Sequence, residues 1–152
     1  MGDSAAETLL EIEAIKQLKA RYFRLMDTKD WEAFPDLFTE DVEIDVSRDA
    51  GEAGRVRGRD RFVAFVKQAV GTARTVHHGH MPEIELTGPA SARGTWAMFD
   101  CVEFSNGAGL RGYGHYVERY AKQGGAWRIA SMQITRLRID RFEAPEGAGG
   151  ER

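Results

Sequence analysis

The sequence has a single cysteine, Cys101, among its 152 residues, so no internal disulfide can form. The N-terminal segment lacks the basic and then apolar pattern of a signal peptide, and no apolar run approaches the length of a membrane span. We therefore expect a cytoplasmic protein with no membrane partner, whose ligand reaches it through solution.

The sequence also lacks a large excess of charge of one sign. It has 21 lysine and arginine residues against 24 aspartate and glutamate residues, interspersed along the chain, for a formal net charge of −3. Binding to nucleic acid needs a broad basic face, which this charge pattern does not predict. Nucleic acid is therefore not an expected partner.

Apolar side chains are abundant enough for one folded domain. The composition is 42% hydrophobic and 30% charged, which is typical of a soluble globular protein, and the length is that of one ordinary domain. We predict a single domain over residues 8–143. The small and polar residues 1–7 and the glycine-rich tail 144–152 are expected to be disordered.

The first half of the chain has mainly helical periodicity. Apolar residues at helical spacing over 9–26 predict a long helix that ends at Asp27. We then expect a short helix over 31–38, a half-buried strand over 41–46, a mobile surface loop over 47–59 and a helix over 60–70.

From Arg74 onward the period changes to that of strands. Four strands are predicted, over 74–86, 91–104, 109–122 and 126–141, joined by glycine-containing turns. Helices followed by hairpin-connected strands indicate an α+β domain. We expect a cone-shaped α+β barrel, in which a curved mixed or antiparallel sheet wraps around the N-terminal helix and leaves a pocket between them.

Three of the four histidines lie close together, at His77, His78 and His80. Histidine exchanges a proton near neutral pH, so this cluster is the leading candidate for chemistry. Neighbouring strand residues face opposite sides, so His77 and His78 cannot both face the pocket. A catalytic zinc site of His78, His80 and His115 is a disfavoured alternative, because no acidic motif that would orient such ligands accompanies them.

Several short motifs resemble one family. They are Ile15–Tyr22 with Asp27 beyond it, Asp30–Phe34 leading to Leu37–Val42, Thr75–His78, and Gly114–Tyr120 before Gly125–Ile129. In these motifs the chain resembles the SnoaL-like group of the nuclear transport factor two-like superfamily, which includes polyketide cyclases, dehydratases and dehydrochlorinases. The resemblance implies the cone-shaped fold, a small hydrophobic substrate, no cofactor and a homo-oligomer, either dimer or trimer.

The resemblance also implies catalytic residues. Dehydrochlorinases and bile-acid dehydratases of this superfamily use an aspartate at the end of the first helix with a later histidine, and Asp27 and His77, fifty residues apart, occupy these places. Tyr22 and Asp100 match a tyrosine and a second aspartate of the bile-acid enzyme. Asp27 would orient His77, His77 would act as general base, Tyr22 would donate a hydrogen bond or a proton, and Asp100 would return a proton.

Each of these residues also has a structural interpretation. Asp27 could face water at the helix end, Tyr22 could pack in the core with a satisfied hydroxyl, and Asp100 could face solvent if its strand has the other register. Arg136 and Arg138 are expected on one face of the last strand, where they would close the pocket against an anionic or halogen-like group. The predicted substrate-binding residues are Trp31, Phe38, Trp96, His78, His115 and Arg136.

Three classes of function follow. The favoured one is a cofactor-independent lyase, of the dehydratase type, or a cyclase that acts on a hydrophobic polycyclic or aromatic molecule by His–Asp general-base catalysis. The alternatives are an isomerase of the ketosteroid type, using Asp100 and Tyr22, and a non-catalytic ligand-binding or dioxygenase-β-like subunit. An epoxide hydrolase of this fold would need an Asp–Arg–Asp set, which the sequence does not reveal.

Overall fold

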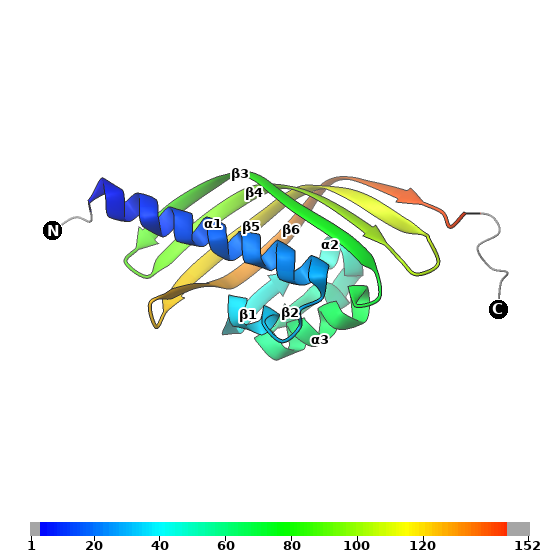
Figure 1. Cartoon of the computed structure of the whole chain (residues 1–152), viewed down its shortest axis with the longest axis horizontal. Helices are drawn as coiled ribbons and strands as arrows, with labels where there is room; N and C mark the ends of the chain where they lie inside the picture. Colours follow the sequence, from blue (N-terminus) through cyan, green and yellow to red (C-terminus); the bar gives the residue numbers. More distant parts are fainter. Residues whose placement is uncertain (1–3, 146–152) are drawn as a thin grey trace.

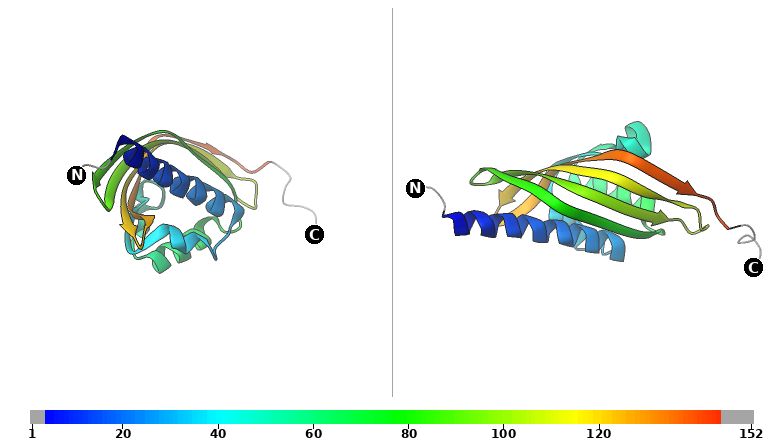
Figure 2. Two further views of the ribbon diagram at one scale, coloured as in Figure 1. Left: turned by 60° about the vertical axis from the view of Figure 1, so that its left-hand side comes forward. Right: turned by 90° about the horizontal axis from the view of Figure 1, so that it is seen from above.

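A computed structural model describes residues 4–145 as one six-stranded mixed sheet with helices on its concave side (Figure 1). The strand order is β2-β1-β6-β5-β4-β3, and the sheet is curved but does not close into a barrel. Helix α1 (Ala5–Thr28) runs along the face formed by β3 to β6 (Figure 2). The prediction of an α+β fold around the N-terminal helix is confirmed.

Helix α1 begins earlier than the sequence periodicity indicated. Ser4 caps it, because its hydroxyl accepts a hydrogen bond from the Glu7 backbone while the Glu7 carboxylate accepts one from the Ser4 backbone. The expected disorder therefore does not extend to residues 5–7, and residues 1–3 lie outside the described part. At the other end, Lys29 adopts a left-handed conformation with φ 61° and stops the helix two residues after Asp27.

The segment after α1 contains more regular structure than expected. It comprises η1 (Phe34–Leu37), β1 (Phe38–Asp45), α2 (Ser47–Ala50), η2 (Gly51–Gly54), β2 (Arg55–Arg57) and α3 (Arg59–Val70). The predicted short helix over 31–38 is only the 3-10 turn η1. Residues 47–59, expected to be an irregular surface loop, instead contain α2, η2 and β2. Asp45 accepts hydrogen bonds from the Ser47 backbone and hydroxyl, and these contacts start α2 directly after β1.

The four long strands are β3 (Arg74–Gly88), β4 (Ser91–Glu103), β5 (Gly109–Gln123) and β6 (Ala126–Phe142). They pair antiparallel in chain order, and their ends lie within two residues of the predicted ones. Strand β1 pairs parallel with β6, which makes the sheet mixed. Of the tail expected to be disordered, residues 146–152 lie outside the described part.

The core lies between α1, α3 and the concave face of the sheet. Tyr22, Phe34, Phe38 and Phe62 pack there with ring centroids 5.1 to 6.3 Å apart. At Gly79 of β3 an added Cβ atom would lie 2.7 Å from the Phe23 ring, so the glycine lets α1 lie close against the sheet. No helix within residues 4–145 is long and apolar enough to cross a membrane.

Candidate active site

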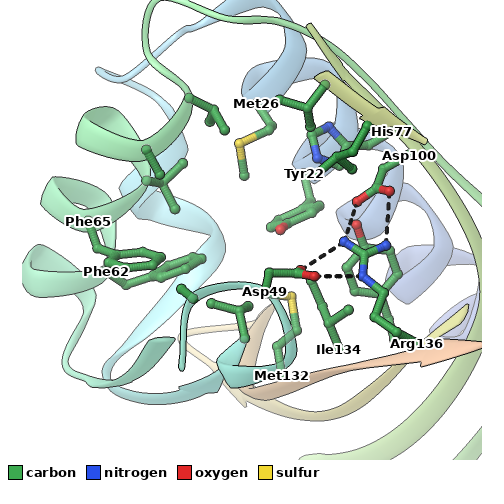
Figure 3. A pocket seen from close by; sticks show the side chains of 18 of the residues that line it. Tyr22, Met26, Asp49, Phe62, Phe65, His77, Asp100, Met132, Ile134 and Arg136 are labelled. Carbon is green, nitrogen blue, oxygen red and sulfur yellow. Dashed lines mark hydrogen bonds and ion pairs between the residues drawn. The ribbon is translucent and has the colours of Figure 1, made fainter. Parts of the chain in front are cut away.

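A cavity of about 270 Å³ opens between α1, α3 and the concave face of the sheet. Figure 3 shows Tyr22, His77 and Asp100 facing Phe62 and Phe65 of α3 across this cavity. Most of the wall is apolar and includes Met26, Phe62, Phe65, Val66, Met132 and Ile134. A cavity of this kind with a few converging polar groups is typical of a site for a small hydrophobic molecule.

Asp27 and His77 form a hydrogen-bonded pair in the wall of this cavity. The His77 Nδ1 atom lies 2.7 Å from Asp27 Oδ1, and the His77 backbone N–H donates to Asp27 Oδ2 over 2.9 Å. The Thr75 hydroxyl also donates to Asp27 Oδ1, and Lys29 Nζ in turn donates to that hydroxyl. These contacts connect the end of α1 to β3 and hold the Asp27 carboxylate and the His77 ring in a fixed relative orientation.

The same contacts determine the charge of Asp27. Burial alone would raise the pKa of this carboxyl, but the hydrogen bonds from His77 and Thr75 outweigh burial and hold the pKa below its usual value. An ionised Asp27 accepts the hydrogen on His77 Nδ1, which leaves a lone pair on Nε2. Within residues 4–145 Nε2 has no hydrogen-bond partner, and the His77 side chain, 10% exposed, lines the cavity.

His78 points the other way because side chains alternate along β3. It is exposed on the outer face of the sheet, where its ring packs against His80 and Phe99. His115 is half-buried beside Ala97 and Thr135 of the neighbouring strands and does not line the cavity either. His78 and His115, both predicted to bind substrate, therefore lie outside the wall of this cavity.

The three predicted aromatic wall residues also lie elsewhere. Phe38 is fully buried in the core, Trp96 is buried and donates a hydrogen bond to the Tyr120 hydroxyl, and Trp31 packs against Phe34. None of the three lines the cavity. Apolar periodicity identifies residues that face inward, but it does not distinguish a packed core from the wall of a cavity within it.

Asp100 faces inward, with its side chain buried in line with Trp96 and Met98. The Arg136 guanidinium donates to both Asp100 oxygens, over 2.9 and 2.8 Å. It also donates to both oxygens of Asp49, over 2.9 and 2.8 Å (Figure 3). Burial alone would lower the pKa of Arg136, but the hydrogen bonds to the two carboxylates raise it, so Arg136 remains a cation.

Sequence reasoning did not identify Asp49. It lies on α2, in the segment expected to be a surface loop, and no spacing connected it to Arg136. The Asp45–Ser47 turn was a signal that α2 would start there, but it did not indicate which side chain would enter the cavity. The structure thus contains an Asp–Arg–Asp set that the sequence did not reveal.

Arg138 does not share the face of Arg136, contrary to expectation. Arg136 lies opposite Gly114 and Arg138 opposite Tyr113, so Leu137 is an extra residue in β6 and is 76% exposed. Such a β-bulge reverses the alternation of side chains beyond it. Arg138 is therefore exposed, where it pairs with Asp140 and lies over the Tyr113 ring.

Two buried tyrosines, Tyr22 of α1 and Tyr116 of β5, complete the polar side of the cavity. Burial, followed by the charge of Glu118 and then those of Asp100 and Asp27, raises the pKa of Tyr22. Burial likewise raises the pKa of Tyr116. Both phenols are therefore neutral hydrogen-bond donors rather than bases. Residues 4–145 contain no cluster of three His, Cys, Asp or Glu side chains placed to hold a metal ion.

The fold is that of the SnoaL-like class within the nuclear transport factor two-like superfamily. Residues 7–133 match the SnoaL-like domain family, so the chain belongs to this family and the resemblance seen in its motifs is confirmed. A relative, "Probable cyclase FGR4" of Gibberella zeae, is 25% identical over 133 residues, which cover 81% of this chain and 89% of that protein.

Solved structures have the same fold. A protein of unknown function from Mycobacterium tuberculosis is 27% identical with a TM-score of 0.75, over 90% of this chain and 77% of that chain. A protein provisionally named scytalone dehydratase, from Novosphingobium aromaticivorans, is 20% identical with a TM-score of 0.80, over 92% and 95%. A hexachlorocyclohexane dehydrochlorinase from Novosphingobium barchaimii is 15% identical with a TM-score of 0.79, over 91% and 94%.

Proposed function

We propose that this protein is a cofactor-independent lyase of the dehydratase type, or a cyclase, for a hydrophobic ring-containing small molecule. The observation that carries the proposal is the 2.7 Å contact between Asp27 and His77 Nδ1 in the wall of an apolar cavity. The names of the relatives, a cyclase, a dehydratase and a dehydrochlorinase, support the same type of reaction.

In this proposal His77 Nε2 removes a proton from a substrate carbon next to an activating group. Asp27 stabilises the imidazolium that forms, and general-base catalysis of this kind contributes about 10²–10⁴-fold in rate. The electron pair of the broken C–H bond forms a C=C bond as the C–O bond to a hydroxyl group breaks. The His77 imidazolium gives its proton to the departing hydroxyl, so water leaves and the enzyme returns to its starting state. In a cyclase, the same electron pair would form the new ring bond to a carbonyl carbon of the same molecule. The C=O π pair of that carbonyl would move onto its oxygen, which would take the proton from the His77 imidazolium.

Tyr22 donates a hydrogen bond to the substrate oxygen on which negative charge develops, because its phenol is neutral and lines the cavity. Asp100 has a different role from the proton return that its sequence position suggested. Since Arg136 donates to both of its oxygens, Asp100 has no oxygen without a hydrogen bond. We propose instead that Asp100 orients Arg136 toward the substrate or the leaving group.

The same ion pair disfavours an isomerase of the ketosteroid type. That mechanism needs a protonated carboxylic acid as a hydrogen-bond donor, and a carboxylate held by two guanidinium N–H groups is acceptor-only. The Asp27–His77 pair disfavours a purely structural subunit, because such a subunit has no need of a proton-transfer pair in an apolar cavity.

A screen of hydroxylated and ketonic polycyclic compounds, read by mass spectrometry for loss of water or for ring closure at unchanged mass, tests the proposal. With any substrate found, His77→Ala and Asp27→Asn should each lower kcat/KM at least about 100-fold. His78→Ala, which alters the exposed neighbour of His77, should leave kcat/KM unchanged and is the matched control. Wild-type turnover in either active-site variant would overturn the proposal in favour of a ligand-binding protein.

A further inference from the structure

A fully buried ion pair lies behind the active site. Lys19 Nζ of α1 lies 2.5 Å from Glu118 Oε1 of β5, and both side chains are 0% exposed. The other Glu118 oxygen accepts a hydrogen bond from the Tyr120 hydroxyl, which itself accepts one from Trp96 Nε1 over 2.9 Å. Glu118 therefore has a partner on each oxygen, and the network is satisfied on the side away from the cavity.

On its other side the Lys19 ammonium faces aromatic rings. Its Nζ atom lies 3.5 Å from the ring centroid of Tyr116 and 4.0 Å from that of Tyr22, with Phe23 at 4.9 Å. These distances are within the range of cation–π interactions. The two tyrosine rings pack edge to face, 6.0 Å apart, and both line the cavity. Lys19 is thus one side chain away from the substrate site.

Stability does not explain why a charge is placed there. Removing two charges from water is costly, and replacing a buried ion pair by apolar residues of similar size is often neutral or stabilising. The Tyr116 hydroxyl is also buried. It has no hydrogen bond of ordinary geometry within residues 4–145, although it lies close enough to the Tyr22 phenol to act on the pKa of that group. Lys19 and the two phenols therefore form one cluster.

We infer that Lys19 is a positioning residue of the active site, whose buried ammonium orients the phenols of Tyr22 and Tyr116 and strengthens them as hydrogen-bond donors to an oxyanion in the cavity. The reaction in which that oxyanion forms rests on the proposed function. The binding of an oxyanion to these phenols does not.

Electrostatics accounts for the effect. Negative charge that shifts onto a phenol oxygen as it donates a hydrogen bond is stabilised by a cation against the ring, and a low-dielectric site strengthens this interaction. Asp27, Asp100 and Glu118 act in the opposite direction and raise the pKa of Tyr22. The Lys19 ammonium lies 4.0 Å from the Tyr22 ring centroid and 3.5 Å from that of Tyr116, so its positive charge opposes these carboxylates, and it also neutralises Glu118 directly.

The effect of Lys19 on the two phenols should depend on pH. Burial lowers the pKa of Lys19 to about 8, and the charge of Glu118 only partly opposes this. The other groups that face Lys19 are Tyr22 and Phe23 of α1 and Tyr116 of β5, with Tyr120 on the far side of Glu118. Phe23 does not titrate, and the pKa values of the tyrosines are raised, so they stay neutral while Lys19 loses its proton. The support from Lys19 should therefore be lost as pH rises through 8.

The test uses 4-nitrophenol as the probe, because the absorbance of the bound probe reports its ionisation directly. The double variant Lys19→Met/Glu118→Gln removes both charges and keeps an acceptor for the Tyr120 hydroxyl. At a fixed pH below 8, the ratio of phenolate to phenol in the bound probe should be about tenfold lower in this variant than in the wild type. Tyr22→Phe, which removes one of the two hydroxyl groups, should also lower this ratio. Lys19→Arg, which keeps a positive charge at this position, should retain much of the wild-type ratio.

A matched control is available in the same fold. Lys122 and Glu11 form a 2.6 Å ion pair between β5 and α1, with Lys122 over the Trp127 ring and away from the cavity. The double variant Lys122→Met/Glu11→Gln should leave the ratio unchanged. An unchanged ratio in the Lys19 variant, an equal loss in the control, or no binding of the probe to the wild type would each overturn the inference.

Different experiments test the role of Lys19 and the proposed lyase or cyclase function, so one proposal can be rejected while the other stands. Wild-type turnover by Asp27→Asn or His77→Ala, together with a changed probe ratio in the Lys19 variant, would reject the lyase mechanism and keep the role of Lys19. Loss of turnover in those variants, together with an unchanged probe ratio in the Lys19 variant, would reject the role of Lys19 and keep the lyase mechanism. With a substrate in hand, the Lys19 variant should lower kcat about tenfold and leave KM unchanged, because the phenols act on developing charge.

Discussion

The guanidinium group of Arg136 occupies the space that a side chain at Gly112 would need. Gly112 pairs with Asp100 across strands β4 and β5, and a Cβ atom added to it would lie 2.1 Å from Arg136 Nη1 and 2.2 Å from Asp100 Oδ1. A glycine is therefore required here to let the ion pair form above the strand. Gly112 thus leaves room on the inner face of the sheet for Arg136 and Asp100 to meet.

Gly112→Ala should separate Asp100 from Arg136, because neither side chain end can keep its position next to a methyl group. We expect a loss of stability of about 1–3 kcal/mol, as for other overpacked sites. We also expect a fall in kcat/KM, because Arg136 loses its position beside the cavity. Urea unfolding and steady-state kinetics measure the two effects. Ala97→Ser, on the outer face of β4, should leave both quantities unchanged. Full activity in Gly112→Ala would show that the ion pair is not needed.

Asp49 connects helix α2 to the active site through Arg136. Replacing Asp49 by asparagine removes one of the two carboxylates that contact Arg136. The bidentate contact between Arg136 and Asp100 remains. Because Asp49 is partly exposed, we expect a change in global stability of only about 1 kcal/mol or less. The expected effect is local, with faster hydrogen exchange of the backbone amides over 47–54 and a higher KM.

The control for this variant is Asp60→Asn, since Asp60 pairs with Arg59 at the surface and does not line the cavity. Exchange rates over 47–54 that match the wild type in Asp49→Asn would mean that the α2 segment is held by its backbone contacts, such as that between Val46 and Gly54, and not by Asp49.

The pH dependence of stability should report the Asp27–His77 pair. The pKa of Asp27 is lower in the folded protein than in the unfolded chain, so its contribution is present above the unfolded pKa and is lost as pH falls through the folded one. Asp27→Asn should therefore be less stable than the wild type at pH 7, by about 1–3 kcal/mol, and the difference should shrink in acid. Denaturant unfolding across pH 3 to 7 measures it.

Asp41→Asn is a suitable comparison, because Asp41 is exposed and its side chain has no hydrogen bond or ion pair in the described part of the chain. A difference between Asp27→Asn and the wild type that stays constant with pH would indicate that the carboxylate acts through packing rather than through its charge.

How far the sequence could predict this molecule depends on which interactions are local. The period of two in β4 placed Asp100 on the same face as Trp96 and Met98, and the structure confirms that face. The strand ends followed from turn residues that act over a few positions. The position of Arg138 could not be predicted in this way, because the bulge at Leu137 changes the register without a sequence signal that the strand pattern would show.

Long-range contacts limited the prediction of the site. Phe38 and Trp96 have the inward pattern that a cavity wall requires, but α1 and the sheet close over them, and only the packed structure separates them from Met132 and Ile134, which line the cavity. Asp49 reaches Arg136 from a segment 87 residues earlier, and Lys19 reaches Glu118 from 99 residues earlier. Neither pair has a spacing that a helix or strand period would produce.

The stability of the Lys19 variant should change with pH in the opposite direction to its activity. The folded pKa of Lys19, about 8, lies below the value of 10.5 for an unperturbed lysine, so between these values the unfolded chain binds more protons than the folded one. The wild type should therefore gain stability relative to Lys19→Met/Glu118→Gln as pH rises from 8 to 10, and urea unfolding at several pH values measures this gain. Over the same range the activity of the wild type should fall toward that of the variant, since the ammonium beside Tyr22 and Tyr116 is lost. A residue that served only to stabilise the fold would make activity rise with stability, so opposite slopes distinguish a functional cation from a structural one.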